Sequence, residues 1–335
     1  MPNLFGENLN KQSLRKHIGD ISQIAGAKEF EFTSGKAKGT KAIEVKNGNG
    51  LSFTILPDRG MDISYFEYKG IPLSYISKTG IVSPNYCQKD GFLKSFGAGL
   101  LTTCGLENIG PACVADSEEL EAHGTISKTP AYDVGILQEW LNDDEFEIKV
   151  RGKVSQTKVF GENLVLTRVI RIKLGEDKIR ISDEIENCGF NKTPIMLLYH
   201  FNFGYPLVCN DTKLETNCMN VRPRDLEANE GFGNYSTFQN PTHNYKEQVF
   251  YYDSVDNSFA SLYNPNLNLG VKVEFDKKQL PYLIQWNQMG ESDYVVGLEP
   301  STWYPEGRAV AAEKGELRFI EPQEVLKFDT VISII

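Results

Sequence analysis

The sequence of 335 residues lacks the features of secreted and membrane-spanning chains. No stretch approaches the roughly 20 consecutive apolar residues of a transmembrane helix. The N-terminal residues 1–19 lack the apolar segment and cleavage signal of a signal peptide. The 6 cysteines are scattered and form no Cys-x-x-Cys pair, which is typical of reduced thiols rather than of a disulfide framework. We therefore expect a cytoplasmic protein.

Positive charge is also scarce. Lys and Arg total 35 against 45 Asp and Glu, which gives a net charge of −10. Nucleic acids and anionic membranes are bound by clustered Lys and Arg, whereas the acidic residues here are spread along the chain. We expect neither kind of partner.

Helical periodicity is limited to one segment, residues 10–25. Its apolar side chains fall three or four positions apart, at Leu14, Ile18, Ile21 and Ile24. This spacing predicts one amphipathic helix, with Ser13 as a candidate N-cap.

Short alternating runs dominate the sequence from Phe30 onward. Apolar and charged residues alternate between 146 and 154, and runs at 164–174 and 179–186 repeat the pattern. Alternation with period two is typical of half-buried antiparallel strands. The residues Gly175–Lys178 between the last two runs predict a hairpin turn.

This pattern predicts an all-β fold, an antiparallel sandwich with a short N-terminal helix on its edge. The chain contains no Pro/Ser-rich linker and no internal repeat. We accordingly expect residues 1–34 to form a helical or edge extension and residues 35–335 to form a single domain.

One expected strand, at 195–206, is apolar on both faces and carries His200 in its middle. A strand of this kind is covered on both faces, so the imidazole is either a satisfied core group or the floor of a site. The alternation places His200 on one face with Leu198 and Asn202. Leu197 and Tyr199 lie on the other face.

Two glycine-containing stretches admit a structural or a functional interpretation. Residues 57–62 place Arg59 between Asp58 and Asp62, either as a local ion pair or as a substrate contact. Residues 96–111 are nearly uncharged, and their glycines allow either close approach of a ligand or a buried irregular crossing.

Two further stretches carry isolated titratable groups. His123 precedes Gly124 where a loop meets a strand, and Glu299 lies on an apolar strand without a basic neighbour. A buried carboxylate has a raised pKa that suits proton transfer, unless a salt bridge with Arg59 or Arg308 holds it. Trp286 is a candidate stacking surface for a sugar.

The sequence lacks the signatures of other chemistries. Gly-x-Ser-x-Gly is absent, and no Ser/His/Asp set is recognisable. His123, His200 and Glu299 are possible metal ligands by type, but no His-x-His or His-x-x-x-His spacing occurs. We therefore favour proton transfer over a metal centre and expect no cofactor.

In this order, these motifs resemble the galactose mutarotase-like superfamily, the aldose 1-epimerase-related proteins. They look closest to a little-studied bacterial branch of it, which is often described as a domain of unknown function. The resemblance covers nearly the whole chain, from about Gly35 to the end, and its short matching motifs are residues 57–62, 97–111, 123–124, 199–202 and 297–300. The resemblance implies an antiparallel β-supersandwich and the interconversion of aldose anomers by acid/base ring opening.

By the same resemblance, Glu299 is the base, His200 is the acid and His123 hydrogen-bonds the sugar. The resemblance also offers further substrate-binding candidates, namely Arg59, Asn108, Trp286 and Gln288. Many mutarotases carry an arginine shortly before the His-Gly motif, and their usual Asp-His pair binds galactose, but neither has a counterpart here. The proton-transfer set is therefore retained, while the identity of the sugar stays open.

Two alternatives share this fold. One is a carbohydrate-binding protein without turnover. The other is a lyase or glycoside-cleaving enzyme, which needs a second carboxylate facing Glu299, with Glu107 or Asp62 as candidates. In each case the expected partner is a small carbohydrate, and the protein is either a monomer or a homodimer.

Overall fold

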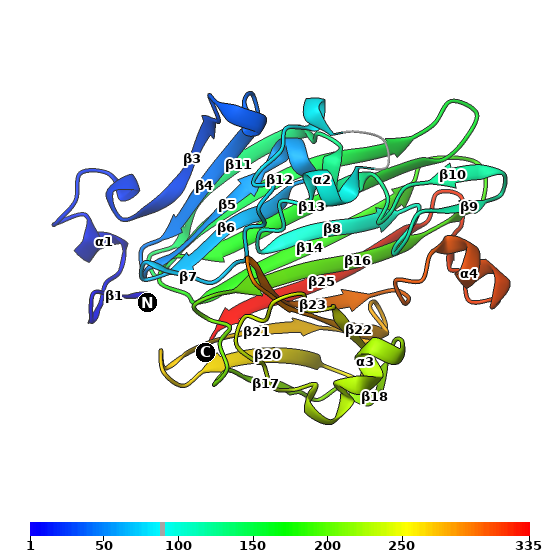
Figure 1. Ribbon diagram of the computed structural model, residues 1–335. Coiled ribbons are helices and arrows are strands. Elements are labelled where there is room, and N and C mark those ends of the chain that lie inside the picture. Colours follow the sequence, from blue (N-terminus) through cyan, green and yellow to red (C-terminus); the bar gives the residue numbers. More distant parts are fainter. Residues whose placement is uncertain (88–90) are drawn as a thin grey trace.

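The computed structural model describes residues 1–87 and 91–335. Its two large sheets, both antiparallel, pack as a sandwich (Figure 1). The smaller sheet has 8 strands, in the order β11 (Tyr132–Asn142), β12 (Glu145–Thr157), β13 (Asn163–Lys173), β14 (Lys178–Asn187), β25 (Val325–Ile334), β21 (Leu269–Phe275), β20 (Ser258–Asn264) and β17 (Lys213–Thr216).

The larger sheet has 11 strands and carries the site described below. Its order is β18 (Met219–Pro223), β19 (Gln248–Asp253), β22 (Tyr282–Gly290), β23 (Asp293–Ser301), β16 (Met196–Gly204), β8 (Leu101–Leu106), β6 (Asp62–Tyr68), β5 (Leu51–Leu56), β4 (Lys41–Asn47) and β3 (Ala25–Glu31), with β7 (Ile71–Pro72) also paired to β6. Three two-stranded pairs complete the strands, β1 (Asn3–Leu4) with β2 (Glu7–Asn8), β9 (Cys113–Ala115) with β10 (Glu118–Leu120), and β15 (Thr193–Pro194) with β24 (Phe319–Ile320).

The helices are short and lie at the periphery of the sandwich (Figure 1). The α-helices are α1 (Lys11–Leu14), α2 (Phe92–Ser95), α3 (Leu226–Glu230) and α4 (Arg308–Glu313). The 3-10 turns are η1 (Ile21–Gln23), η2 (Gly35–Ala37), η3 (Pro57–Arg59), η4 (Pro84–Tyr86), η5 (Ile126–Lys128) and η6 (Phe232–Asn234). Within the described residues, none of these helices has the length and apolar character needed to cross a membrane.

The expected strands and the hairpin are confirmed. Side chains of β12 alternate between buried and partly exposed along its whole length. β13 and β14 pair antiparallel across the turn at 174–177, with Ile170 opposite Ile181. The buried side chains of both sheets then meet as one hydrophobic core, since period-two alternation puts every second residue on the inner face.

The N-terminal helix is much shorter than expected. α1 ends at Leu14, and only the turn η1 follows before β3. Asn10 caps α1, and Ser13 completes the capping box from inside the helix rather than serving as the N-cap. Asp20 accepts a hydrogen bond from the Ser22 N–H and starts η1 separately, because an Asp side chain competes for backbone donors and breaks a continuous helix.

The expected extension at 1–34 contains the edge strand of the larger sheet. β3 pairs with β4 over its whole length, with Ala27 opposite Val45. The sheet therefore begins ahead of residue 35, the expected start of the sandwich domain.

A charged cluster connects the two sheets inside the core. The Arg168 guanidinium on β13 is fully buried and donates to Asp183 on β14 and to Asp62 on β6. Tyr199 on β16 donates its hydroxyl to Asp183 at 2.7 Å. Buried charges are tolerated only when they are paired and hydrogen-bonded, so this cluster fixes how the two sheets face each other.

The strand β16 is buried at every position because both of its faces are covered. Leu197, Tyr199, Phe201 and Phe203 point into the core between the sheets. Met196 and Leu198 pack into a second apolar cluster on the opposite face of the larger sheet. The predicted division of the strand into two faces is thus confirmed, and His200 lies on the face turned away from the main core.

Candidate active site

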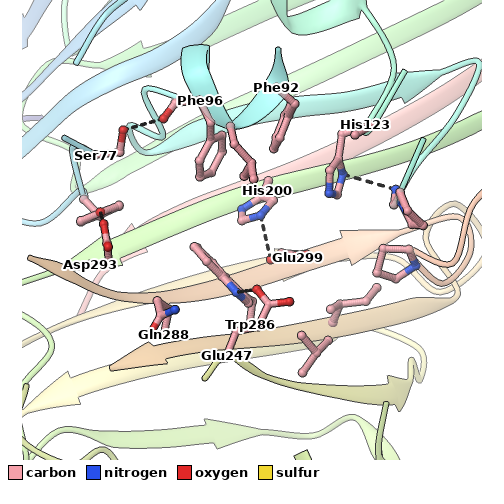
Figure 2. Close-up of a pocket in the computed structure, with 18 of the residues that line it drawn as sticks. Ser77, Phe92, Phe96, His123, His200, Glu247, Trp286, Gln288, Asp293 and Glu299 are labelled. Carbon is pink, nitrogen blue, oxygen red and sulfur yellow. Dashed lines mark hydrogen bonds and ion pairs between the residues drawn. The ribbon is translucent and has the colours of Figure 1, made fainter. Parts of the chain in front are cut away.

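A cleft of about 850 Å³ lies over the face of the larger sheet that carries His200. Its floor is formed by β16, β22 and β23, and its walls come from loops and from α2 (Figure 2). Aromatic rings make much of the wall, with Phe92 and Phe96 above His200 and Trp286 beside it. Deep clefts of this volume with an apolar lining and a few convergent polar groups are typical of small-molecule sites.

Two titratable side chains meet on the floor of the cleft. β16 and β23 are hydrogen-bonded neighbours with Phe201 opposite Leu298, a register that sets His200 opposite Glu299. Nε2 of His200 lies 3.2 Å from Oε1 of Glu299, and the two side chains are only 8% and 3% exposed. Figure 2 shows this contact at the centre of the cleft. The resemblance implied that Glu299 is the base and His200 the acid, and the structure brings these two side chains into contact.

Burial sets the protonation of this pair. Loss of hydration lowers the pKa of His200 to about 3, with His123 adding to the effect and Asn202 opposing it. Loss of hydration also raises the pKa of Glu299 well above its usual value, since burial penalises each charged form. Burial therefore disfavours the charged form of both groups, so a proton held by the pair is favoured on the carboxyl group.

Gly297 makes room for the Glu299 carboxyl group. The two residues lie on the same face of β23, and a Cβ at position 297 would stand 2.5 Å from Oε1 of Glu299 and 3.1 Å from Cβ of Trp286. Any side chain at 297 would therefore displace the carboxyl group from its present position.

His123 reaches the cleft from a loop held by close backbone packing. A Cβ on Gly124 would stand 2.1 Å from the Gly105 carbonyl oxygen, so only glycine fits after His123. The Gly110 N–H donates to Nδ1 of His123 at 3.5 Å. Because Nδ1 accepts, the neutral ring carries its proton on Nε2 and has a donor to offer. Burial lowers the pKa of His123 to about 4.

Two successive polar contacts fix the orientation of the Trp286 indole. Its indole Nε1–H donates to Oε2 of Glu247 at 2.8 Å. Arg224 donates to the other oxygen of Glu247 at 3.0 Å. Gln288 follows two residues later on the same face of β22 and also lines the cleft. A fixed indole of this kind presents an apolar face beside the reacting pair.

An ion pair closes the far end of the cleft. Lys78 donates to Asp293 at 2.6 Å, and the Tyr75 hydroxyl donates to the same carboxylate at 3.2 Å. The sequence pattern does not point to Tyr75, Lys78, Asp293, Glu247 or the two phenylalanines. They come from loops and strand ends far apart in the chain, and no local motif marks them.

Five of the seven residues expected in the site line this cleft, namely His123, His200, Trp286, Gln288 and Glu299. Arg59 and Asn108 do not, and we correct both expectations. The Arg59 guanidinium is buried and donates to the carbonyl oxygens of Ser127, Val82 and Ser95. It binds backbone rather than substrate.

Asn108 is likewise a structural residue. Its amide donates to the carbonyl oxygens of Pro111 and Glu121, and its Oδ1 accepts from the Arg308 N–H. These bonds satisfy the side chain inside the loop that supports His123. The glycines of this stretch also serve backbone packing, since a Cβ at Gly110 would stand 2.3 Å from the Pro305 carbonyl oxygen.

Neither candidate for a second carboxylate faces Glu299. Asp62 belongs to the buried Arg168 cluster, and Glu107 lines a separate cavity. Within residues 1–87 and 91–335, no group of three or more His, Cys, Asp or Glu side chains is arranged to hold a metal ion. All 6 cysteines are free thiols.

The two-sheet antiparallel sandwich, with its cleft on the outer face of the larger sheet, has the architecture of the galactose mutarotase-like proteins. A solved structure described as a "putative aldose 1-epimerase" from Klebsiella pneumoniae matches it with a TM-score of 0.87 at 23% identity, covering 97% of this chain and 86% of that one. The chain belongs to the family described as a domain of unknown function, DUF4432, which it matches over residues 37–334.

Two further solved structures show the same fold. A galactose mutarotase-like protein from Clostridium acetobutylicum has a TM-score of 0.64 at 16% identity, covering 93% of this chain and 99% of that one. A galactose 1-epimerase from Lactobacillus acidophilus has a TM-score of 0.60 at 13% identity, with the same coverage of 93% and 99%. At these identities the matches establish a shared fold. They do not establish a shared activity. No curated protein matches the chain in sequence.

Proposed function

We propose that this protein is a mutarotase, an isomerase that interconverts the α and β anomers of an aldose by opening and closing its ring. The observation that carries the proposal is the contact between His200 and Glu299 on the floor of an open cleft. One imidazole and one carboxyl group that share a proton are the two groups that this reaction needs.

The proton balance of the reaction fits the pair. Transfer of the shared proton from Oε1 of Glu299 to Nε2 of His200, across 3.2 Å, gives a carboxylate and an imidazolium. Glu299 then takes the proton of the anomeric hydroxyl while His200 protonates the ring oxygen, and the C1–ring oxygen bond breaks. Rotation about C1–C2 and closure on the other face of the aldehyde reverse both transfers, and no cofactor is consumed.

The remaining residues of the cleft bind the sugar. Nε2–H of His123 donates to a sugar oxygen and stabilises the charge that develops during ring opening, since Nδ1 is already engaged. Trp286 stacks on the apolar face of the pyranose, and the Gln288 side chain binds a hydroxyl group further along β22. Both pocket cations are paired with carboxylates, which favours a neutral sugar.

Exchange NMR tests this proposal. Saturation of one anomeric proton should transfer to the other anomer for at least one aldose in a broad panel, at a rate proportional to the concentration of protein. A sugar that binds and shows no such transfer would make the protein a carbohydrate-binding module instead. A new reducing end released from a glycoside would identify a cleaving enzyme.

A further inference from the structure

Two buried polar atoms on the site face of β16 have no hydrogen-bond partner within the described residues. They are Nδ1 of His200 and Oδ1 of Asn202. The side chains are two residues apart on one strand, so they project from the same face. A buried polar atom without a partner costs free energy, and two such atoms side by side indicate a shared role.

The amide of Asn202 has only one orientation that satisfies its surroundings. Its Nδ2 donates to the Gly99 carbonyl oxygen at 3.1 Å and to the His200 carbonyl oxygen at 2.7 Å. A flipped amide would set Oδ1 against both carbonyl oxygens, where acceptor would meet acceptor. Oδ1 is therefore fixed as an acceptor on the side of the strand where His200 lies.

The other ring nitrogen of His200 faces Glu299, whose Oε1 is itself a buried atom without a hydrogen-bond partner among the described residues. Nε2 lies 3.2 Å from Oε1 of that carboxyl group. The other rings packed around His200 belong to Phe96, His123 and Trp286. Phenylalanine offers no acceptor, the indole of Trp286 is a donor only and donates to Glu247, and Nδ1 of His123 already accepts from the Gly110 N–H. Within this shell, Oδ1 of Asn202 is the acceptor available to Nδ1.

We propose that Asn202 is a positioning residue that holds His200 in the Nδ1–H tautomer. Its amide oxygen accepts the Nδ1 proton and leaves the Nε2 lone pair facing Glu299. The importance of this tautomer for turnover rests on the proposed function, whereas the tautomer itself does not. The protonated carboxyl group can then donate to Nε2, so every proton that enters or leaves the imidazole passes through the nitrogen that faces the cleft.

The electrostatics of the site agree with this arrangement. Burial and His123 both lower the pKa of His200, and the Asn202 side chain is the group that raises it. An acceptor at Nδ1 stabilises the imidazolium, as carboxylate and carbonyl partners of imidazoles do in other sites. Without it, the doubly protonated ring would carry a buried N–H with no partner.

Long-range ¹⁵N–¹H correlation spectra of protein labelled with ¹⁵N-histidine test the proposal at neutral pH. The chain has 4 histidines, and the signals of His200 are assigned by their loss in His200→Gln. We expect a protonated Nδ1 and an unprotonated Nε2 for His200, and the opposite tautomer for His123. A protonated Nε2 on His200 in the wild-type protein overturns the proposal, whatever the protein catalyses.

Two variants separate positioning from a merely structural role. Asn202→Gln keeps both the amide donor and the amide oxygen, so the Nδ1–H tautomer should persist. Asn202→Leu removes the acceptor, so Nε2–H should become populated. If the protein anomerises a sugar, kcat of the leucine variant should fall by about ten-fold or more with KM changed much less.

An unchanged tautomer in folded Asn202→Leu would contradict the proposal. Should that variant fail to fold, the wild-type and Asn202→Gln spectra decide. Absence of turnover for every sugar would reject the mutarotase while leaving the tautomer result intact.

Discussion

Replacement of Gly297 by alanine moves the carboxyl group of Glu299, the proposed base, and leaves that group chemically unchanged. The new Cβ would stand 2.5 Å from Oε1 of Glu299, whereas ordinary contact begins at 3.4 Å. The carboxyl group must therefore move by about 0.9 Å from its present position. Misplacement of a reacting group by about 1 Å can cost on the order of 100-fold in rate, or about 2.7 kcal/mol of barrier.

The fold should tolerate this substitution. Gly297 lies inside β23 and its φ is not positive, so alanine fits the backbone. We expect kcat for anomeric exchange to fall by about 100-fold, with a melting temperature close to that of the wild type. The matched control is Gly135→Ala on β11, where a Cβ meets no atom within 4 Å. Wild-type kcat in folded Gly297→Ala would refute this explanation of the glycine.

Three further predictions address the core, the acid response and the indole. Arg168→Met leaves two buried carboxylates, Asp62 and Asp183, without their partner. The free energy of unfolding measured by urea titration should fall by about 3–5 kcal/mol. A loss below about 1 kcal/mol would contradict this prediction. The pKa of His123 falls from 6.5 to about 4 on folding. Below pH 6.5 the unfolded chain therefore binds a proton that the folded protein does not, and the free energy of unfolding falls as the pH is lowered from 6.5 towards 4. The His123 ring is partly open to the cleft, which reduces the size of this effect. Between pH 7 and 4.5 the free energy of unfolding of the wild type should fall by on the order of 1–2 kcal/mol more than that of His123→Gln. Equal losses in the two proteins would show that the ring stays solvated. Glu247→Ala frees the Trp286 indole and should raise KM with little change in kcat and shift the tryptophan fluorescence; an unaltered KM would mean that the indole does not contact the sugar.

The sequence predicts the positions of strands and the two faces of each strand, because both depend on local alternation of apolar and polar residues. Period-two patterns locate β12, β13 and β14, and the same logic assigns the two faces of β16. Alternation alone therefore puts His200 on the correct face of its strand. The pairing of His200 with Glu299 does not follow from alternation, because it depends on the register between two strands that are nearly 100 residues apart.

The buried Arg168 cluster has a signature in the sequence. Arg168 and Asp183 occupy inward positions of their strands, between apolar residues, and they lie directly opposite each other. A charged residue in the inward phase of an alternating strand indicates a buried ion pair. The apolar residues of these strands predict the strands themselves but give no sign of the cluster.

The errors at Arg59 and Asn108 have a different cause. Polar residues in glycine-rich turns bind either ligands or backbone, and sequence alone does not distinguish the two. Here the loops that they stabilise are irregular, and their carbonyl oxygens need buried donors. Both side chains therefore support the cleft from outside it.

The central claim is that Glu299 and His200 transfer protons to and from a sugar. The most direct measurement is the anomeric exchange rate of the best aldose substrate with the wild type and with Glu299→Gln. Glutamine keeps the shape of the side chain and cannot accept the proton, so exchange should fall to the uncatalysed rate while the protein stays folded and still binds the sugar. Exchange at the wild-type rate in folded Glu299→Gln would contradict the account.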